Sequence, residues 1–516
     1  MTATADAPVR HRPPLAVPSG PLTAARLVWL ELRHNAMPWM LPLVAGLFWF
    51  DSCRPSTVMP PIWVVRTFWN MGQGHTFIDF GPFVAAVAAW MGSRDGRRGV
   101  ADLVTATARP RWAGQLATWA ATAIWAVGAY LVFVAVMFGV YAYQGVQGSP
   151  PWWWVAVGAA AVLAFSALGF AVGALYPSRF AAPLAAFGAF LALALSSQTG
   201  FSSLTGWAQI LPTNSNGNYQ PPSGTFYPYL PDVPIARIMF LAGIALAALG
   251  LTGLPAWAGS MWPRRAAAGV TLIGLAAAGT AVGLVEEAYV GPHGMVVPGL
   301  HDAASDRPMP YTPVCGRAAG VPVCLNPAYP NTLAGVTAGL RPVFVELAGL
   351  PGAPARATQV AGLYSSGEGG AGQAMTLSGQ PPVLRMPLDS LNLPGSFGVT
   401  QTQFAQELQV LAVHAFVGAG NGAGTPAQQA LQAALLQGVG MPFAEQPAIL
   451  STTGLPSWAS LGEAPSPHGQ GPPKAGGPVY AAARRFVTLP GPQRHAWLAA
   501  HLAALRSGGL TLAQLP

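Results

Sequence analysis

Two cysteines in the segment CGRAAGVPVC, Cys315 and Cys324, are the residues whose type and spacing point most directly to chemistry. A pair this close forms a disulfide that closes a short loop if the segment lies in an oxidising compartment. Free thiols or half of a metal site are the alternatives, but no histidine or further cysteine stands nearby to complete tetrahedral zinc ligation. Cys53 is left over. We expect the disulfide.

Histidines offer the next possible chemistry. His495 and His501 in HAWLAAH are six positions apart, which places them about 120° apart on a helix of roughly 3.6 residues per turn. A zinc peptidase needs histidines at i and i+4 with an adjacent glutamate, so this interpretation fails. His414 lies in an apolar helical run, AVHAF, where a packed or hydrogen-bonded structural role is expected. No Gly-x-Ser-x-Gly elbow occurs, and we predict no enzyme, cofactor or metal for this chain.

Nucleotide binding is the third possibility. A phosphate-binding loop has the pattern Gly-x-x-x-x-Gly-Lys-Ser/Thr, in which the lysine reaches the phosphates. The only lysine in the chain, Lys474 in GPPKAGGP, is not in such a loop. Any ATP-driven process would therefore need ATP and magnesium bound by another chain.

The composition indicates which kinds of structural region carry these residues. Of 516 residues, 52% are hydrophobic and 8% are charged, whereas a soluble domain has about 25% charged residues. Long charge-free stretches fill positions 37–290, and charges return after Asp302. The sequence therefore divides into a membrane half and a polar half.

Seven segments approach or exceed the roughly 20 apolar residues that a membrane span needs. They are residues 36–51, 76–92, 113–143, 152–176, 180–197, 234–260 and 267–288. The fold expected is an α-helical polytopic membrane protein, with a six-span domain over 36–260, a seventh, tethering span over 261–290, and a mixed, mainly helical domain over 291–516. In that domain the runs PVFVEL and PVLRMPL are candidate strands, and FAQELQVLAVHAF, ALQAALLQ and RHAWLAAHLAALR are candidate helices.

Arginines predict the orientation, because positive residues near a span stay on the cytoplasmic side. With the N-terminus inside, 12 arginines are cytoplasmic and two or three lie outside; the inside set is Arg10, Arg12, Arg26, Arg33, Arg94, Arg97, Arg98, Arg109, Arg111, Arg179, Arg264 and Arg265. An odd number of spans then places residues 291–516 outside the bacterial plasma membrane. Residues 1–20 resemble a disordered cytoplasmic tail without a signal peptide, and residues 21–35 an interfacial helix in contact with membrane lipid.

The basic stretch SRDGRRGVADLVTATARPRW, residues 93–112, is then the longest cytoplasmic loop between spans. Val100, Leu103 and Val104 fall on one face of a short helix over about 99–108. Asp102 is in its first turn, and Pro110 closes it between two arginines that suit the end of the helix dipole, Arg109 and Arg111. Such a helix either lies on headgroups or presses its apolar face into another protein. The arginines by themselves have a simpler explanation, because positive residues near a span serve to keep a loop on the cytoplasmic side.

The sequence GRRGVADLVTATARPRW, followed by an uninterrupted span, resembles the loop after the second span of bacterial ABC-type exporter permeases. In that family the loop is a coupling helix that docks in the ATPase subunit. The resemblance covers about residues 22–260 and implies that Asp102, Leu103 and Val104 face the ATPase, with Val100 beside them and Arg109 and Arg111 next to it or to lipid. It implies a second permease copy or paralogue as a further partner. The seventh span departs from the family pattern.

Two function classes remain in competition. The first is an exporter permease that moves a hydrophobic or amphipathic compound, with no nucleic-acid partner. The second is an ion-driven transporter, or a membrane-anchored sensor whose outside domain binds a ligand. Residues 112–178 and 180–231 contain no Asp, Glu, Lys or Arg, which disfavours ion coupling at the membrane midplane. Asp79, Glu286 and Glu287 lie near the outer surface, where reaching the headgroups competes with a proton relay.

Overall fold

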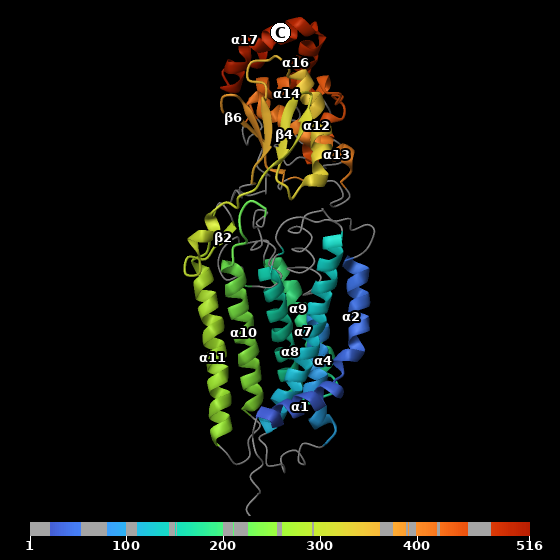
Figure 1. Ribbon diagram of the computed structural model, residues 1–516, viewed down its shortest axis with the longest axis vertical. Helices are drawn as coiled ribbons and strands as arrows, with labels where there is room; N and C mark the ends of the chain where they lie inside the picture. Colours follow the sequence, from blue (N-terminus) through green and yellow to red (C-terminus); the bar gives the residue numbers. More distant parts are fainter. Residues whose placement is uncertain are drawn as a thin grey trace, which may run out of the picture.

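The computed structural model consists of a long helical bundle with a mixed α/β domain beyond one end of it (Figure 1). The structure describes residues 21–52, 80–99, 111–143, 150, 152–199, 210, 225–254, 261–291, 294–361, 375–388, 391, 399–419, 424–452 and 476–516, and all helices and strands given for this protein lie within these ranges.

Four helices of the bundle are long and apolar enough to cross a membrane. They are α7 (Arg111–Tyr143), α8 (Trp152–Leu175), α10 (Asp232–Gly253) and α11 (Met261–Glu286). Three of the seven predicted spans fall instead on helices with shorter apolar stretches, namely α2 (Met37–Ser52), α4 (Gly81–Gly92) and α9 (Ala181–Thr199). The described residues thus support a multi-pass membrane protein with four candidate spans.

Helix α1 (Pro21–Arg33) lies across the lower end of the bundle in Figure 1, at a steep angle to the long helices. Two hydrogen bonds attach this region to α7: Trp125 Nε1 donates to the Leu32 carbonyl (3.0 Å), and Asn35 Nδ2 donates to Thr122 Oγ1 (2.9 Å). Asn35 also caps the start of α2, because its Oδ1 accepts from the Met37 backbone N–H at 2.9 Å. The helix predicted over 21–35 is therefore present and is held against the bundle.

Small residues bring the membrane helices into close contact. A Cβ atom on Gly169 of α8 would strike the carbonyl oxygen of Ala85 in α4, and one on Gly173 would strike that of Ala89. Helices α10 and α11 meet in the same way, since a Cβ on Gly243 would lie 2.6 Å from the Gly274 carbonyl oxygen. Lipid tails are as apolar as leucine, so helices in a membrane gain by close backbone packing rather than by burial.

The C-terminal domain contains a five-stranded mixed sheet. Its strands are β3 (Val314–Ala318), β4 (Val321–Leu325), β5 (Arg356–Gln359), β6 (Thr376–Ser378) and β7 (Val383–Met386), in the order β3-β4-β5-β7-β6. The β4–β5 and β5–β7 pairs are parallel, and the two outer pairs are antiparallel. A small hairpin of β1 (Tyr289–Gly291) and β2 (Gly294–Val296) comes between α11 and this domain.

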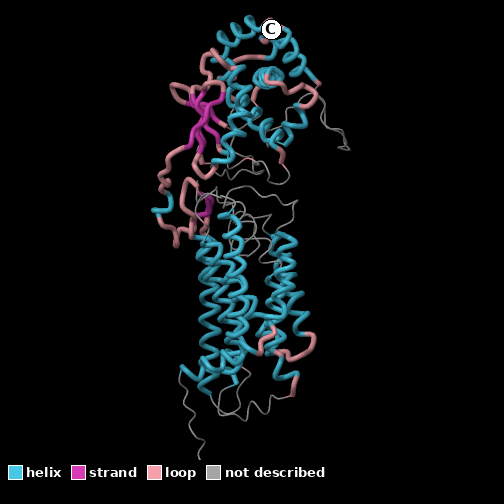
Figure 2. Tube along the Cα trace, turned by 45° about the vertical axis from the view of Figure 1, so that its right-hand side comes forward, coloured by secondary structure: helices cyan, strands magenta, loops and turns pink. Residues whose placement is uncertain are grey.

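Six helices complete the domain, and Figure 2 shows the strands on one side of it and the helices on the other. The helices are α12 (Leu333–Glu346), α13 (Gln401–Val417), α14 (Pro426–Gly438), α15 (Gln446–Thr452), α16 (Gly477–Thr488) and α17 (Gly491–Arg506). Helix α12 connects the parallel strands β4 and β5, as a parallel pair requires. Helix α14 is central, because residues 427–436 are all buried.

Most local predictions for this domain are confirmed, and one is wrong. PVLRMPL contains β7, and α13, α14 and α17 form where helices were expected, with α17 ending just before Gly508 at φ +73°. The run PVFVEL is helical, not a strand. Its Val343 and Phe344 continue a buried stripe that begins with Val336 and Leu340, so helical packing overrides the β preference of Val and Phe.

Candidate functional site

Five of the six residues predicted to couple to an ATPase lie outside the described residues: Val100, Asp102, Leu103, Val104 and Arg109. The sixth, Arg111, is the first residue of α7. Gly99, at φ +65°, is the last described residue before the gap. The structure therefore describes both flanks of the predicted coupling loop, and these flanks define what the loop is attached to.

The upstream flank is held by an ion pair with α1. Arg94, in the short helix α5 (Arg94–Arg97), donates through both terminal nitrogens to the two carboxylate oxygens of Glu31, at 2.8 and 2.9 Å. Both side chains are about four-fifths buried. The hydrogen bond with Glu31 raises the pKa of Arg94 above its ordinary value. Bidentate pairs of this kind fix geometry as well as charge, so α1 and the loop entrance are joined.

Arg97 is held by α4 itself. Its guanidinium lies 3.4 Å from the centroid of the Trp90 ring, and it donates to Ser93 Oγ (3.0 Å) and to the Trp90 carbonyl (2.9 Å). Desolvation lowers the pKa of Arg97, and the charge of Arg98 adds to that effect. The side chain therefore stays folded against the helix end.

Two further contacts join the loop flanks to other helices. A Cβ on Gly96 would strike the ring of Pro177 in the α8–α9 turn, so this turn lies directly against α5. On the downstream flank, the Trp112 indole Nε1 donates to the Leu249 carbonyl of α10 at 3.1 Å, and its ring lies 3.0 Å from where a Gly253 Cβ would be. The loop thus begins and ends on residues that contact α1, the α8–α9 turn and α10.

Positive charge collects at this same end of the bundle, which we call the basic end. In Figure 1 it comprises α1, the end of α4, the start of α7, the α8–α9 turn and the start of α11. Its described acidic residues are Glu31 and Asp95, and its described arginines are Arg26, Arg33, Arg94, Arg97, Arg98, Arg111, Arg179, Arg264 and Arg265. Segments far apart in sequence therefore combine into one positively charged end.

A second polar cluster joins the opposite end of the bundle to the segment that leads into the C-terminal domain. Asp232, the first residue of α10, is fully buried, and its Oδ2 accepts from the Val297 backbone N–H at 3.0 Å. The His301 ring nitrogens face two carboxylates: Nδ1 lies 3.0 Å from Asp232 Oδ2, and Nε2 lies 3.1 Å from Asp306 Oδ2. We call Asp232, His301 and Asp306 the junction cluster.

The junction cluster fits a protonated histidine. A neutral imidazole has one N–H and can donate to only one carboxylate, whereas an imidazolium donates to both. The hydrogen bond to Asp306 is the largest effect on the pKa of His301 and raises it; burial opposes this increase, and the hydrogen bond to Asp232 and the charges of both carboxylates add to it. Sequence reasoning missed this cluster, because Asp232 is 69 positions away from His301 in the chain and the three residues form no motif.

Two hydrogen bonds and one ring contact tie the segment before α10 to the C-terminal part of the chain. Asn326 Nδ2 donates to the Thr225 carbonyl at 3.1 Å, and the Met309 backbone N–H donates to the Phe226 carbonyl at 2.7 Å. The rings of Phe226 and Tyr311 meet edge to face with centroids 5.5 Å apart. The C-terminal part of the chain is therefore attached both to the first residue of α10 and to the segment that precedes it.

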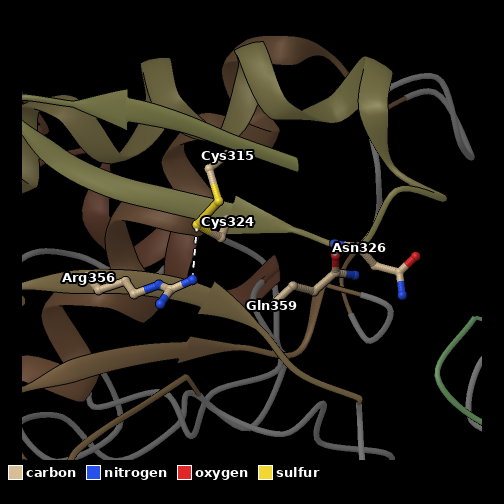
Figure 3. The surroundings of a disulfide bond; sticks show 5 residues. All are labelled: Cys315, Cys324, Asn326, Arg356 and Gln359. Carbon is tan, nitrogen blue, oxygen red and sulfur yellow. Dashed lines mark hydrogen bonds between the residues drawn. A yellow bond between two sulfur atoms is a disulfide. The ribbon is translucent and has the colours of Figure 1, made fainter. Parts of the chain in front are cut away.

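Cys315 and Cys324 are directly opposite each other on β3 and β4 and form a disulfide (Figure 3). Arg356 of β5 donates through a terminal nitrogen to Cys324 Sγ at 3.3 Å. The bond therefore joins two neighbouring strands of the sheet rather than tying a loop to a distant element.

The described histidines on the helices of the domain are separate from one another. His414 is buried and its Nδ1 lies 3.0 Å from Gln432 Oε1, which is the packed, hydrogen-bonded environment expected from the sequence. His495 contacts the Ala348 carbonyl, and His501 stacks on Trp497. Within the described residues, no group of three or more His, Cys, Asp or Glu side chains is arranged to hold a metal ion.

Of the three acidic residues considered for a proton relay, Asp79 lies outside the described residues. Glu286 and Glu287 are exposed at the end of α11.

Comparison with protein-family profiles, with curated protein sequences and with solved structures gives no match for this chain.

Proposed function

We propose that this chain is the permease subunit of an ATP-driven exporter, coupled to a separate ATPase subunit through the helix predicted over 99–108. The observation that carries the proposal is the attachment of that segment: its flanks contact α1, the α8–α9 turn and α10 through Arg94, Gly96 and Trp112. A force applied to the loop would reach three parts of the bundle at once. A loop that served topology alone would have no need of these contacts.

The charge distribution supports an orientation for this proposal. Because positive residues are retained on the cytoplasmic side, the basic end faces the cytoplasm, where an ATPase would be. The C-terminal domain then lies outside, in a compartment that permits the Cys315–Cys324 disulfide. In this arrangement α2, α9 and the segment that contains α4 join α7, α8 and α10 to make a six-span bundle. Helix α11 is the additional span.

The mechanism requires no covalent chemistry from this chain. ATP, bound with magnesium by the partner, supplies the free energy, and binding shifts the permease between two arrangements for which the partner has different affinities. The apolar face of the loop, with Leu103 at its centre, would seat in the ATPase. The Arg94–Glu31 ion pair and the Trp112–Leu249 hydrogen bond would pass the movement to α1 and α10.

A test begins with the full-length chain purified by affinity tag from its native membrane. We expect an ATPase subunit with a phosphate-binding loop to co-purify, and Leu103→Arg and Asp102→Arg to abolish both this association and substrate-stimulated ATP hydrolysis. Arg26→Gln, a charge change on the remote side of α1, is the control and should leave the association intact. Undiminished association of the Leu103→Arg variant would refute the coupling role.

A membrane-anchored sensor is the second candidate, and the junction cluster favours it. A ligand bound by the C-terminal domain would act on α10 through Asp232 and His301, without any ATPase. The two proposals separate clearly: a sensor purifies without an ATPase subunit, and its ligand protects the C-terminal domain from hydrogen exchange in the isolated full-length chain.

A further inference from the structure

The five-stranded sheet has one covered face and one open face. Alternation along the strands places Val323, Ala357 and Leu384 on the covered face, where they are buried against the helices. The opposite side chains include the exposed arginines of β3, β5 and β7, which are Arg317, Arg356 and Arg385. Figure 2 shows that the described helices of the domain lie to one side of the strands. We call the other side the open sheet face.

Among the described residues, the charge on the open sheet face has no acidic partner. The strand residues contain three arginines and no Asp, Glu or Lys, and none of these arginines forms an ion pair with any described residue. Arg356 and Arg385 occupy diagonal positions on neighbouring parallel strands, since Arg356 pairs with Val383 and Thr358 with Arg385. Like charges this close on a sheet are unfavourable unless an anion lies between or above them.

The described residues use only a small part of the hydrogen-bonding capacity of these guanidinium groups. The bonds formed are Arg317 to the Gly320 carbonyl (3.2 Å), Arg356 to Cys324 Sγ (3.3 Å) and Arg385 to Ser378 Oγ (3.1 Å). A guanidinium has five N–H donors, so several donors of each arginine form no bond with another described residue. Thr358 and Thr376 are the residues directly opposite Arg385 on its two neighbouring strands, and both add hydroxyl donors.

We propose that the open sheet face binds an extended polyanion that carries phosphate groups. Guanidinium forks and adjacent hydroxyls match phosphate oxygens. The arginines are on β3, β5 and β7, and strands lie about 4.8 Å apart, so the set spans about 14 Å, which is wider than one phosphate. The five strands contain no aromatic residue on which a nucleobase would stack, so a phosphate polymer without bases fits better than a nucleic acid.

The experiment measures binding of a fluorescently labelled short linear polyphosphate to the full-length protein in detergent. We expect Arg356→Ala/Arg385→Ala to weaken binding about a hundredfold, or roughly tenfold for each charge-assisted contact. The matched control, Arg341→Ala/Arg485→Ala, removes two exposed charges from α12 and α16 and should change affinity less than about twofold. Binding should also weaken as salt screens the charges.

Three results would overturn the proposal. Equal losses in the sheet variant and the control variant would assign the binding to net charge alone. Tighter binding of a single-stranded oligonucleotide of matched charge would assign the face to nucleic acid. Competition by inorganic phosphate at an equal concentration of phosphate groups would reduce the site to a single-anion pocket. Thermal unfolding of the sheet variant must match that of the unaltered protein, and we expect no loss of stability because like charges are removed.

Discussion

The helical bundle and the C-terminal domain pack their interiors with side chains of opposite size. Small residues let the helices of the bundle approach one another, and large residues fill the core of the domain. In the bundle, Gly169 and Gly173 let α8 approach the backbone of α4. In the domain, large side chains such as Phe404 and Phe416 fill the core. Water makes the burial of large apolar groups favourable, at about 25 cal/mol per Å², whereas lipid does not. One chain therefore follows two packing rules, and it changes from one to the other after α11.

The largest expected effect comes from adding volume to the bundle. Gly169→Leu/Gly173→Leu would drive side chains into the backbone of α4, which cannot move aside as a side chain can, and we expect loss of the folded bundle. Size-exclusion chromatography and thermal unfolding in detergent measure this. Gly188→Leu on α9, where nothing lies within 4 Å of the added Cβ, should behave like the unaltered chain. An equal loss in both variants would contradict specific α4–α8 packing.

Removing volume from the domain should have the next largest effect. Phe404 is completely buried in α13, and Phe404→Ala should lower the free energy of unfolding of the domain by about 3–5 kcal/mol. Hydrogen exchange of α12 and α13 in the full-length chain measures the loss. The exposed neighbour Thr402→Ala provides the control, and a loss below about 1 kcal/mol for Phe404→Ala would show that the core relaxes around the cavity.

Breaking the Arg94–Glu31 ion pair at the basic end should have a smaller effect on stability. In a double-mutant cycle, Glu31→Gln and Arg94→Gln should show a coupling energy of about 1–2 kcal/mol, because both side chains are mostly buried and paired through two hydrogen bonds. Thermal unfolding in detergent gives the four stabilities needed. Glu31→Gln combined with Arg97→Gln should be additive, since Arg97 contacts Trp90 instead. Absence of coupling in the first cycle would show that the Arg94–Glu31 pair does not stabilise the contact between α1 and α5.

The smallest effect concerns the junction between the two regions. The folded-state pKa of His301 is raised, so its contribution is complete below the unfolded value of about 6.5 and is lost as pH rises through the folded pKa. Asp306 is partly exposed, so we expect about 1 kcal/mol. Protection of the Val297 N–H, corrected for intrinsic exchange, should therefore fall as pH rises above about 6.5. His301→Gln should abolish this dependence, and His495→Gln should retain it.

Sequence reasoning succeeded where local pattern determines structure. Long charge-free runs identified α7, α8, α10 and α11, and apolar periodicity identified α13 and α14. It failed for PVFVEL, where a β-favouring composition also had helical spacing, and its count of seven spans exceeds the four long apolar helices described. The sheet order, the junction cluster and the Arg94–Glu31 pair were not predicted, because each depends on contacts between residues distant in sequence.

Helix α10 is contacted near both of its ends, by Trp112 at Leu249 and by His301 at Asp232. Its 22 residues make a rod about 33 Å long, at 1.5 Å per residue. Pivoting this rod by about 5° at its Leu249 end would displace its Asp232 end by about 3 Å, more than a hydrogen bond tolerates. The C-terminal domain must then either move with α10 or lose its contacts with it, so the position of the domain would report, across the whole length of the bundle, a movement at the opposite end of α10.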